Sequence, residues 1–379
     1  MKIEQNIWNE RKGWLNGPLG GLGDKAQLVL IFCERELLKK QQGLAEIKKA
    51  YPKAKLMGCS TAGEIFDTRV TDDHLAISAI SFGSTKIQGA QVGMAEVKNS
   101  HEAGVKLAKS IEHKGLVHLF VLSDGVVVNG SELVRGLTEN LPANVAITGG
   151  VAGDGANFKE TYVFFDQVPQ QKVVAVLGFY GKDLKVGYGS LGGWDPFGPF
   201  RQVTKSKGNI LYELDGKSAL GLYKQYLGDQ AKGLPATGLL YPLEVRVNDQ
   251  DRAVVRTILS VSEQEDSMTF AGDVPEGAHA RLMKANFDHL IDGALSAAKV
   301  SREILGSFEA ELAILISCVG RKLVLAQRVE EEVEGVREVL GKRPALIGFY
   351  SYGEIAPFKP QAKCELHNQT MTITVLAEE

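Results

Sequence analysis

The sequence predicts an α/β protein of two domains, with mixed β-sheets flanked by helices and a partly duplicated β-α-β unit that ends on a glycine loop. Two observations predict this fold. Short apolar runs alternate with charged segments of helical periodicity, a pattern typical of α/β folds. In addition, one pattern that opens on Gly and closes on Gly-Glu-Ile stands near both ends of the chain, at residues 58–65 and 348–355. Repetition of this kind indicates repeated structural units.

Composition sets limits on the class of protein. The 379 residues favour two domains or three, and the formal net charge of -3 gives no reason to expect a nucleic-acid or membrane partner. No apolar run approaches the roughly 20 residues that a membrane-spanning helix needs, and the first residues lack the apolar core of a signal peptide. The four cysteines, at positions 33, 59, 318 and 364, lie far apart, as buried free thiols in a reducing compartment would. We therefore expect a cytoplasmic protein.

The first unit follows a polar, glycine-rich extension at residues 1–24. The apolar run 28–33 predicts a buried strand, and residues 34–51 predict an amphipathic helix that Pro52 ends. The first glycine loop comes next, and residues 75–82 predict the strand after it. This order of elements is that of a β-α-β unit.

The pattern runs a second time, less closely, in the middle of the chain. Residues 102–112 and 131–141 predict helices, with Ser131 as the cap of the second. The apolar run 116–122 predicts a strand covered on both faces, and residues 145–148 predict a strand that enters another glycine-rich loop. Strand-like alternation follows at 161–166, 172–180 and 184–190.

Residues 192–200 are too rich in Gly and Pro to predict regular structure, and we expect a domain boundary between 207 and 216. The N-terminal domain then spans 25–206 and the C-terminal domain 217–379. Further helices are predicted at 218–227 and 284–305, and further strands at 241–247, 254–262 and 267–271. A second copy of the opening unit completes the chain, and the four glutamates between 330 and 334 are expected to face water.

The glycine loops do not match known catalytic motifs. A phosphate-binding loop opens a helix, whereas the segments after Gly63, Gly155 and Gly353 predict strands. A hydrolase nucleophile needs G-x-S-x-G, which Ser60 misses in spacing and Ser351 in its first glycine. Neither H-E-x-x-H nor C-x-x-C occurs. We therefore do not expect an enzyme, although one that uses pocket carboxylates as acid and base remains an alternative.

The remaining interpretation of the glycine loops is that they bind a small ligand. A glycine loop lets backbone approach a ligand closely, and Glu64, Asp154 and Glu354 each follow such a glycine. Each carboxylate could line a pocket or cap a loop amide. The full set of predicted ligand-binding residues is Ser60, Gly63, Glu64, Ser123, Asp124, Asn129, Gly150, Asp154, Trp194, Arg321, Tyr350, Ser351 and Glu354. Within it, Arg321 could meet an acidic ligand group or pair with Glu354.

Several motifs together resemble those of the FIST family of sensory proteins. Residues 122–125, 129–130 and 149–155 look like motifs of its N-terminal half. Residues 241–243, 272–277, 317–321 and 348–355 look like motifs of its C-terminal half. The resemblance covers roughly residues 25–375, and its specificity lies in the joint order of the motifs. It implies an intracellular sensory module that binds a small ligand.

A chain without an attached effector domain is similar to the NosP branch of that family. This similarity implies haem b as cofactor, nitric oxide as signal, and a histidine kinase or a cyclic-di-GMP enzyme as partner in a two-component system, and it leaves homo-oligomer formation open. His367 is the first candidate for the iron ligand and His118 the second; either could instead be a core histidine. A sensor of an amino acid or another small polar metabolite is the alternative.

Overall fold

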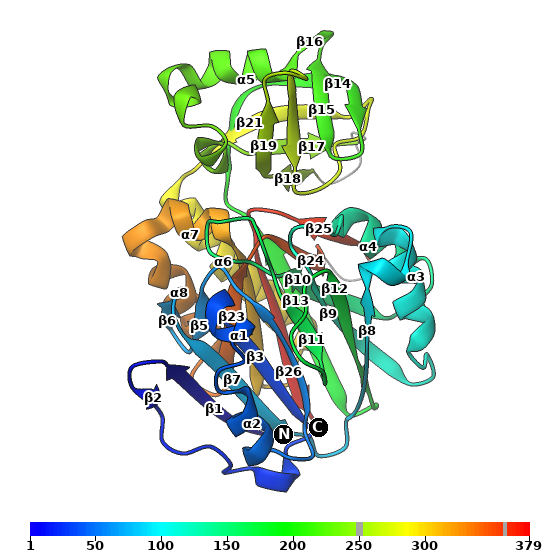
Figure 1. Ribbon diagram of the computed structural model, residues 1–379, viewed down its shortest axis with the longest axis vertical. Helices are drawn as coiled ribbons and strands as arrows, with labels where there is room; N and C mark the ends of the chain where they lie inside the picture. Colours follow the sequence, from blue (N-terminus) through cyan, green and yellow to red (C-terminus); the bar gives the residue numbers. More distant parts are fainter. Residues whose placement is uncertain (248–252, 359–361) are drawn as a thin grey trace.

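The computed structural model describes residues 1–247, 253–358 and 362–379 (Figure 1). It confirms the predicted α/β class, with mixed sheets and helices in two lobes: a large body and a small lobe formed by residues 195–284. The boundary predicted between 207 and 216 lies within the small lobe, so the two lobes are not the two halves of the sequence. No helix in the described part of the chain is long and apolar enough to cross a membrane.

The large body consists of three units built on five equivalent strands each, and β2 (Gly13–Trp14), β6 (Arg69–Thr71) and β25 (Cys364–His367) extend its sheets at their edges. Unit 1 contains β1 (Lys2–Asn9), β3 (Leu28–Cys33), β4 (Lys55–Ser60), β5 (Glu64–Phe66) and β7 (Leu75–Ser81). Unit 2 contains β8 (Lys86–Gly93), β9 (Leu116–Ser123), β10 (Ala146–Val151), β11 (Val163–Phe165) and β12 (Val173–Tyr180). Unit 3 contains β13 (Leu184–Leu191), β22 (Leu312–Cys318), β23 (Ala345–Ser351), β24 (Gly353–Pro357) and β26 (Met371–Glu378). Residues 2–9 were expected in an irregular extension, but they pair with β7 as the first strand of unit 1.

The units share one pairing pattern and exchange one strand in a ring. In each unit the second and third strands run parallel, and the fifth lies antiparallel to the second. The fourth strand leaves its own unit and pairs with the third strand of another: β5 with β23, β24 with β10, and β11 with β4. The exchange closes three mixed sheets into a single body, so each glycine loop contacts the next.

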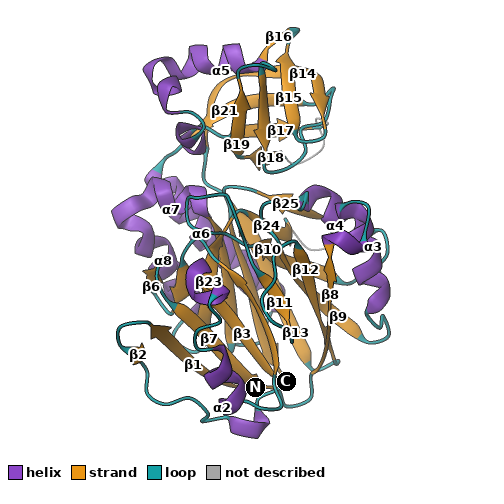
Figure 2. Ribbon diagram, in the orientation of Figure 1, coloured by secondary structure: helices purple, strands orange, loops and turns teal. Residues whose placement is uncertain are grey.

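Side chains from all three units fill the space between the sheets. The core joins strands of every unit, and the rings of Phe32 and Phe349 lie with their centroids 4.7 Å apart. Helices cover the outer faces of the sheets (Figure 2). They are α1 (Arg35–Lys39), α2 (Leu44–Ala50), α3 (Ser100–Ser110), α4 (Gly130–Thr138), α6 (Phe287–Leu305), α7 (Val319–Leu325) and α8 (Val329–Leu340). The single helix predicted over 34–51 is broken because Gln41 and Gly43 adopt left-handed backbone conformations, with φ of 56° and 74°.

The small lobe is inserted into unit 3, between β13 and α6. It contains α5 (Ala219–Leu227), β14 (Asp195–Lys207), β15 (Ile210–Leu214), β16 (Lys217–Ser218), β17 (Leu243–Arg246), β18 (Val254–Arg256), β19 (Ile258–Ser262), β20 (Ser267–Phe270) and β21 (His279–Lys284). Residues 195–200, which were expected to be irregular, belong to β14, and the start of the helix predicted at 284 belongs instead to β21. An apolar core between these strands and α5 stabilises the lobe.

The opening glycines of the first and last copies, Gly58 and Gly348, have a steric reason. A Cβ added at Gly348 would lie 1.8 Å from the carbonyl oxygen of Leu315 on the neighbouring strand, and one at Gly58 would lie 2.3 Å from that of Ile31. Gly348→Ala should therefore lower the free energy of unfolding by at least about 2 kcal/mol, since backbone cannot move aside without repacking the core. Gly83→Ala is the control, because its Cβ would meet side-chain atoms at 3.4 Å or more. If urea titrations gave the same decrease in the free energy of unfolding for Gly348→Ala and Gly83→Ala, this explanation would be contradicted.

Candidate functional site

A cavity of about 210 Å³ lies between the two lobes. Both lobes line it. The body contributes Gly125, Val126, Val127, Val128, Asn129, Gly130, Val151, Tyr352 and Leu366, and the small lobe contributes Asn209, Leu259, Phe270 and Ala271. Residues 125, 129 and 130 belong to the N-terminal motifs, and Tyr352 to a C-terminal one. Motif residues that are distant in sequence therefore meet at one place.

Asp124 builds the loop that forms one wall of this cavity. Its carboxylate is buried; Oδ1 accepts hydrogen bonds from the amides of Val126 and Val127, both at 2.9 Å, and Oδ2 accepts from the Thr161 hydroxyl at 2.8 Å and the Lys172 amide at 3.0 Å. With both oxygens engaged, Asp124 shapes the loop and does not face the cavity.

Hydrogen bonds between the lobes lie beside the cavity. Asn129 caps α4 through Oδ1, which accepts from the amide of Glu132 at 3.1 Å, and its Nδ2 donates to Asp273 of the small lobe at 2.9 Å. The predicted cap, Ser131, instead accepts from the Asp273 amide at 3.3 Å. Arg256 donates from the small lobe to the carbonyl of Leu366 at 2.8 Å. These hydrogen bonds thus connect the body and the small lobe on either side of the cavity.

Glu64 and Glu354 hold equivalent places in units 1 and 3. Both carboxyl groups are fully buried, and each accepts a hydroxyl hydrogen bond from the residue three positions earlier, Thr61 or Ser351. Glu354 also accepts from the amide and hydroxyl of Thr370, at 3.2 and 2.9 Å. Burial raises the pKa of both carboxyl groups to about 8. This arrangement agrees with the interpretation that they cap their own loops.

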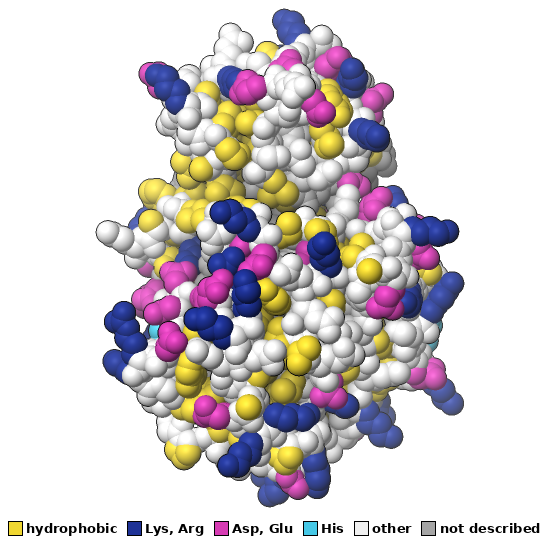
Figure 3. Space-filling model, viewed as in Figure 1, with side chains coloured by type: hydrophobic (Ala, Val, Ile, Leu, Met, Phe, Trp, Pro, Cys, Tyr) yellow, Lys and Arg dark blue, Asp and Glu magenta, His cyan; other side chains and the backbone are white. Residues whose placement is uncertain are grey.

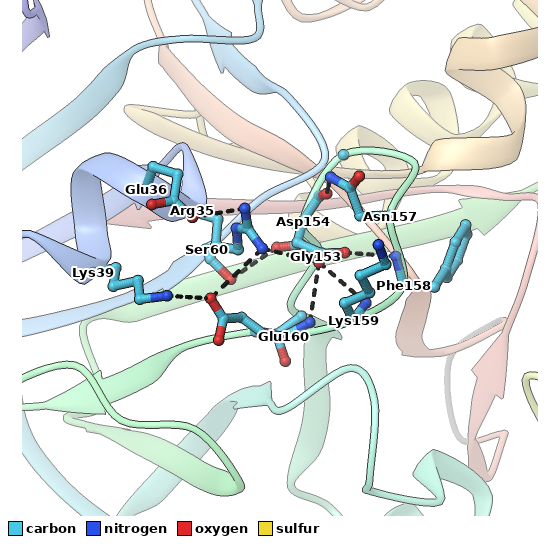
Figure 4. A network of polar contacts seen from close by, with 12 residues as sticks. Arg35, Glu36, Lys39, Ser60, Gly153, Asp154, Asn157, Phe158, Lys159 and Glu160 are labelled. Carbon is cyan, nitrogen blue, oxygen red and sulfur yellow. Dashed lines mark hydrogen bonds and ion pairs between the residues drawn. The ribbon is translucent and has the colours of Figure 1, made fainter.

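Asp154 holds the equivalent place in unit 2 but organises an exposed loop (Figure 4). Its Oδ1 accepts from the Phe158 amide at 2.8 Å, and its Oδ2 accepts from the amides of Lys159 and Glu160, at 3.1 and 3.0 Å. The Tyr352 hydroxyl also donates to Oδ1. Asp154 therefore connects this loop to a residue of the cavity wall.

Arg321 is a buried structural residue. It forms an ion pair with Glu332 at 2.7 Å, with both side chains fully buried, and donates to the carbonyls of Gly192 and Leu290 at 2.9 and 2.7 Å. The structure thus gives it neither the predicted pairing with Glu354 nor a place on the cavity. Glu332, expected to face water, is buried, and this prediction was wrong for that residue.

Most other predicted residues are buried in internal contacts. The Ser60 hydroxyl donates to the Gly153 carbonyl at 2.8 Å, and the Tyr350 hydroxyl donates to Glu332 at 2.7 Å. Ser123 and Trp194 donate to the carbonyls of Asp124 and Gln369, and Ser351 donates to the Glu354 carboxylate. Gly63 and Gly150 lie against Lys322 and Ile316. Of the predicted set, Asn129 lines the cavity, while Tyr352, Asn209 and Phe270 were missed; Tyr352 at least lay within a motif.

The surroundings of the two candidate iron ligands do not fit a haem. His367 is buried, its Nε2 lies 2.8 Å from the Ala356 carbonyl oxygen, and its ring packs on Phe358 with centroids 4.1 Å apart. His118 lies in the core strand β9 with Nε2 2.9 Å from the Thr148 hydroxyl, and burial lowers its pKa to about 3. Among the described residues neither histidine lines the inter-lobe cavity, and no cluster of three or more His, Cys, Asp or Glu could hold a metal ion.

Two family models match consecutive parts of the chain. The FIST N domain matches residues 27–217, and the FIST C domain matches residues 219–357. A relative, "Uncharacterized protein MJ1623" of Methanocaldococcus jannaschii, is 26% identical over 87% of this chain and 70% of its own length. Among solved structures, cyanuric acid hydrolase from A. caulinodans aligns with 78% of this chain and 99% of its own at 10% identity; the TM-score of 0.19 is too low to carry an argument. The chain belongs to the FIST family, whose domains are sensory domains that bind small ligands.

Proposed function

We propose that this protein is a non-enzymatic sensor that binds a small polar metabolite in the cavity between its lobes. One observation carries the proposal: motif residues of the FIST N domain, in the loop 125–130, meet Tyr352 and residues of the small lobe at this cavity. A ligand between two lobes can favour one arrangement of them over another, provided that its contacts differ between the two states.

The lining supports a small, uncharged ligand. At about 210 Å³, the cavity is smaller than the roughly 300–1,000 Å³ that is usual for drug-sized ligands. None of the described lining residues carries a charge, and a buried charge without a partner is unfavourable. The valines, Leu259 and Phe270 offer apolar contact, while the amides of Asn129 and Asn209 are polar. An amino acid fits the volume, but its charged groups would need partners beyond this lining.

The haem hypothesis remains a separate prediction with its own test. It would make the protein a nitric-oxide sensor of the NosP type that signals to a histidine kinase or a cyclic-di-GMP enzyme. The packing around His367 and His118 does not support it, and we derive no step through haem. A stoichiometric Soret band after addition of haem to the purified protein, lost in His367→Ala or His118→Ala, would support it over the metabolite hypothesis.

Occupation of the cavity can be tested by filling it. Ala271→Phe places a ring in the cavity, and Ala45→Phe makes the same change on the exposed face of α2. In a thermal-shift screen of amino acids and neutral amides and alcohols, a ligand at about 100 times its Kd stabilises the folded state by about 2.7 kcal/mol. We expect a hit to raise the melting temperature of wild type and Ala45→Phe by several degrees, and to leave Ala271→Phe unchanged. An equal shift in all three proteins would place the ligand elsewhere.

A further inference from the structure

Tyr352 stands between the inter-lobe cavity and an exposed loop of the body. Its side chain lines the cavity and is almost fully buried. Its ring stacks on that of Phe158, with centroids 4.2 Å and planes 17° apart. Its hydroxyl accepts from the backbone amides of Asp154 and Phe158, each at 3.1 Å, and donates to the Asp154 carboxylate. The Tyr352 side chain therefore contacts both the inter-lobe cavity and the exposed loop that contains Phe158.

Loop 155–160 depends on the carboxylate that Tyr352 holds. Three consecutive amides, those of Phe158, Lys159 and Glu160, donate to Asp154 and gather around it in Figure 4. The Asp154 carboxylate is buried, so these amides lose their shared acceptor if it turns away. The backbone of residues 158–160 is thus held by a carboxylate inside the body, while the Asn157 side chain adds a hydrogen bond to the Asp154 carbonyl at 2.6 Å.

Phe158 is held in a conformation that it would not adopt freely. Its φ of 54° lies in the left-handed region, which is unfavourable for a bulky residue and persists only where the surroundings impose it. The restraints on Phe158 are its amide bonds to Asp154 and Tyr352 and its stacking on Tyr352. Displacement of Tyr352 removes two of these restraints together and favours a different conformation of the loop.

The outer side of the loop faces water and connects to the first unit. Ala156, Asn157 and Lys159 are exposed. Glu160 pairs with Lys39 of α1 at 2.8 Å and with Arg35 at 3.5 Å. A change in the conformation of Phe158 would therefore alter the exposed surface of loop 155–160 and the ion pairs between Glu160 and α1. A partner molecule that binds this surface would encounter both changes.

We propose that Tyr352 couples occupation of the inter-lobe cavity to the conformation of loop 155–160, so that the loop reports the bound state at the protein surface. The inference rests on the proposed function, because it uses the same cavity. A group placed against Tyr352 shifts its ring, the hydroxyl leaves Asp154, and Phe158 relaxes from its left-handed conformation. Tyr352 acts here as a positioning residue.

Hydrogen exchange without any ligand tests the inner half of this route. In Tyr352→Phe the ring remains but the hydroxyl is lost, and we expect the amides of residues 158–160 to exchange at least about tenfold faster, as loss of a charge-assisted hydrogen bond implies. The matched control is Tyr350→Phe, whose hydroxyl donates to Glu332, on another side of the body. Unchanged exchange of residues 158–160 in Tyr352→Phe, or an equal increase in the control, would overturn the proposal.

The cavity half of the route is tested with Ala271→Phe, whose added ring stands in for an occupant. We expect exchange of residues 158–160 to change at least about threefold relative to wild type, and to show no further change when Ala271→Phe is added to Tyr352→Phe. A loop insensitive to Ala271→Phe would overturn the coupling. This result is independent of the thermal-shift screen, so absence of a metabolite hit and absence of coupling are distinguishable.

Discussion

Arg321→Met should lower the free energy of unfolding by about 3–5 kcal/mol, the usual cost of leaving one partner of a buried ion pair alone. Both side chains of the Arg321–Glu332 pair are fully buried, and among the described residues the substitution leaves Glu332 with the hydroxyls of Ser317 and Tyr350 as its donors. Two carbonyls, those of Gly192 and Leu290, also lose the hydrogen bond that Arg321 donates. Because total stability is commonly about 5–15 kcal/mol, this is a large share of it.

Urea titration of purified variants measures this loss. The matched control is Arg328→Met, since Arg328 pairs with Asp288 and Glu331 on the surface and exposed pairs contribute about 0–1 kcal/mol. The double variant Arg321→Met/Glu332→Leu should recover part of the loss, because it removes the unpaired charge. A loss below about 1 kcal/mol in Arg321→Met would contradict the assignment of this pair as structural.

Stability should also fall as pH rises from about 4.5 to about 8, through the two buried carboxyl groups Glu64 and Glu354. Burial raises the pKa of both to about 8, so the folded state keeps protons that the unfolded state releases from about pH 4.5. The stabilisation is therefore complete below the unfolded pKa and is lost as pH rises through this window. Linkage gives about 1.4 kcal/mol per pH unit for each group.

The variant Glu64→Gln/Glu354→Gln tests this dependence, because Gln cannot ionise. We expect the difference between its free energy of unfolding and that of wild type to increase steadily from pH 5 to pH 8. Glu378→Gln is the control. Burial alone would raise the pKa of Glu378, but hydrogen bonds from residues 83–85 lower it to about 2. The effect of Glu378→Gln on the free energy of unfolding should therefore stay constant between pH 5 and 8. Parallel curves for wild type and the double variant would show that Glu64 and Glu354 do not titrate as described.

The repeat was visible in the sequence, but its threefold form was not. The copies at 58–65 and 348–355 share their opening Gly and their closing Gly-Glu-Ile, whereas the middle copy has Val151 and Ala152 where the last has Ser351 and Tyr352. The strand exchange joins residues far apart in the chain, such as Ile65 with Gly348, and local periodicity carries no information about such pairs. The α/β class followed from local patterns, while the closed body needed the non-local pairing.

Glu332 shows a signal that could have been used. It lies three residues after Val329 and four before Val336, so helical geometry places it on the inward face despite the acidic run around it. Treating the glutamates as one solvated group hid this exception. The burial of Arg321 beside it then follows from the need to pair the charge.

The candidate site was predictable only in part. Asn129 and the motif containing Tyr352 could be selected because polar residues after buried strands often bind ligands. Asn209 and Phe270 could not be predicted from the sequence. They lie in the small lobe, and they line the cavity because the folded chain packs that lobe against the body. Figure 3 shows hydrophobic side chains at this junction between the lobes and charges of both signs elsewhere on the same face, which agrees with the small net charge.

A crystal structure of the protein with a metabolite found by thermal shift tests the central claim most directly. The account predicts density for the metabolite between Asn129 and Asn209, in contact with Tyr352, and a changed conformation of loop 155–160. Density at any other place, such as beside His367, with the inter-lobe cavity unchanged, would contradict it.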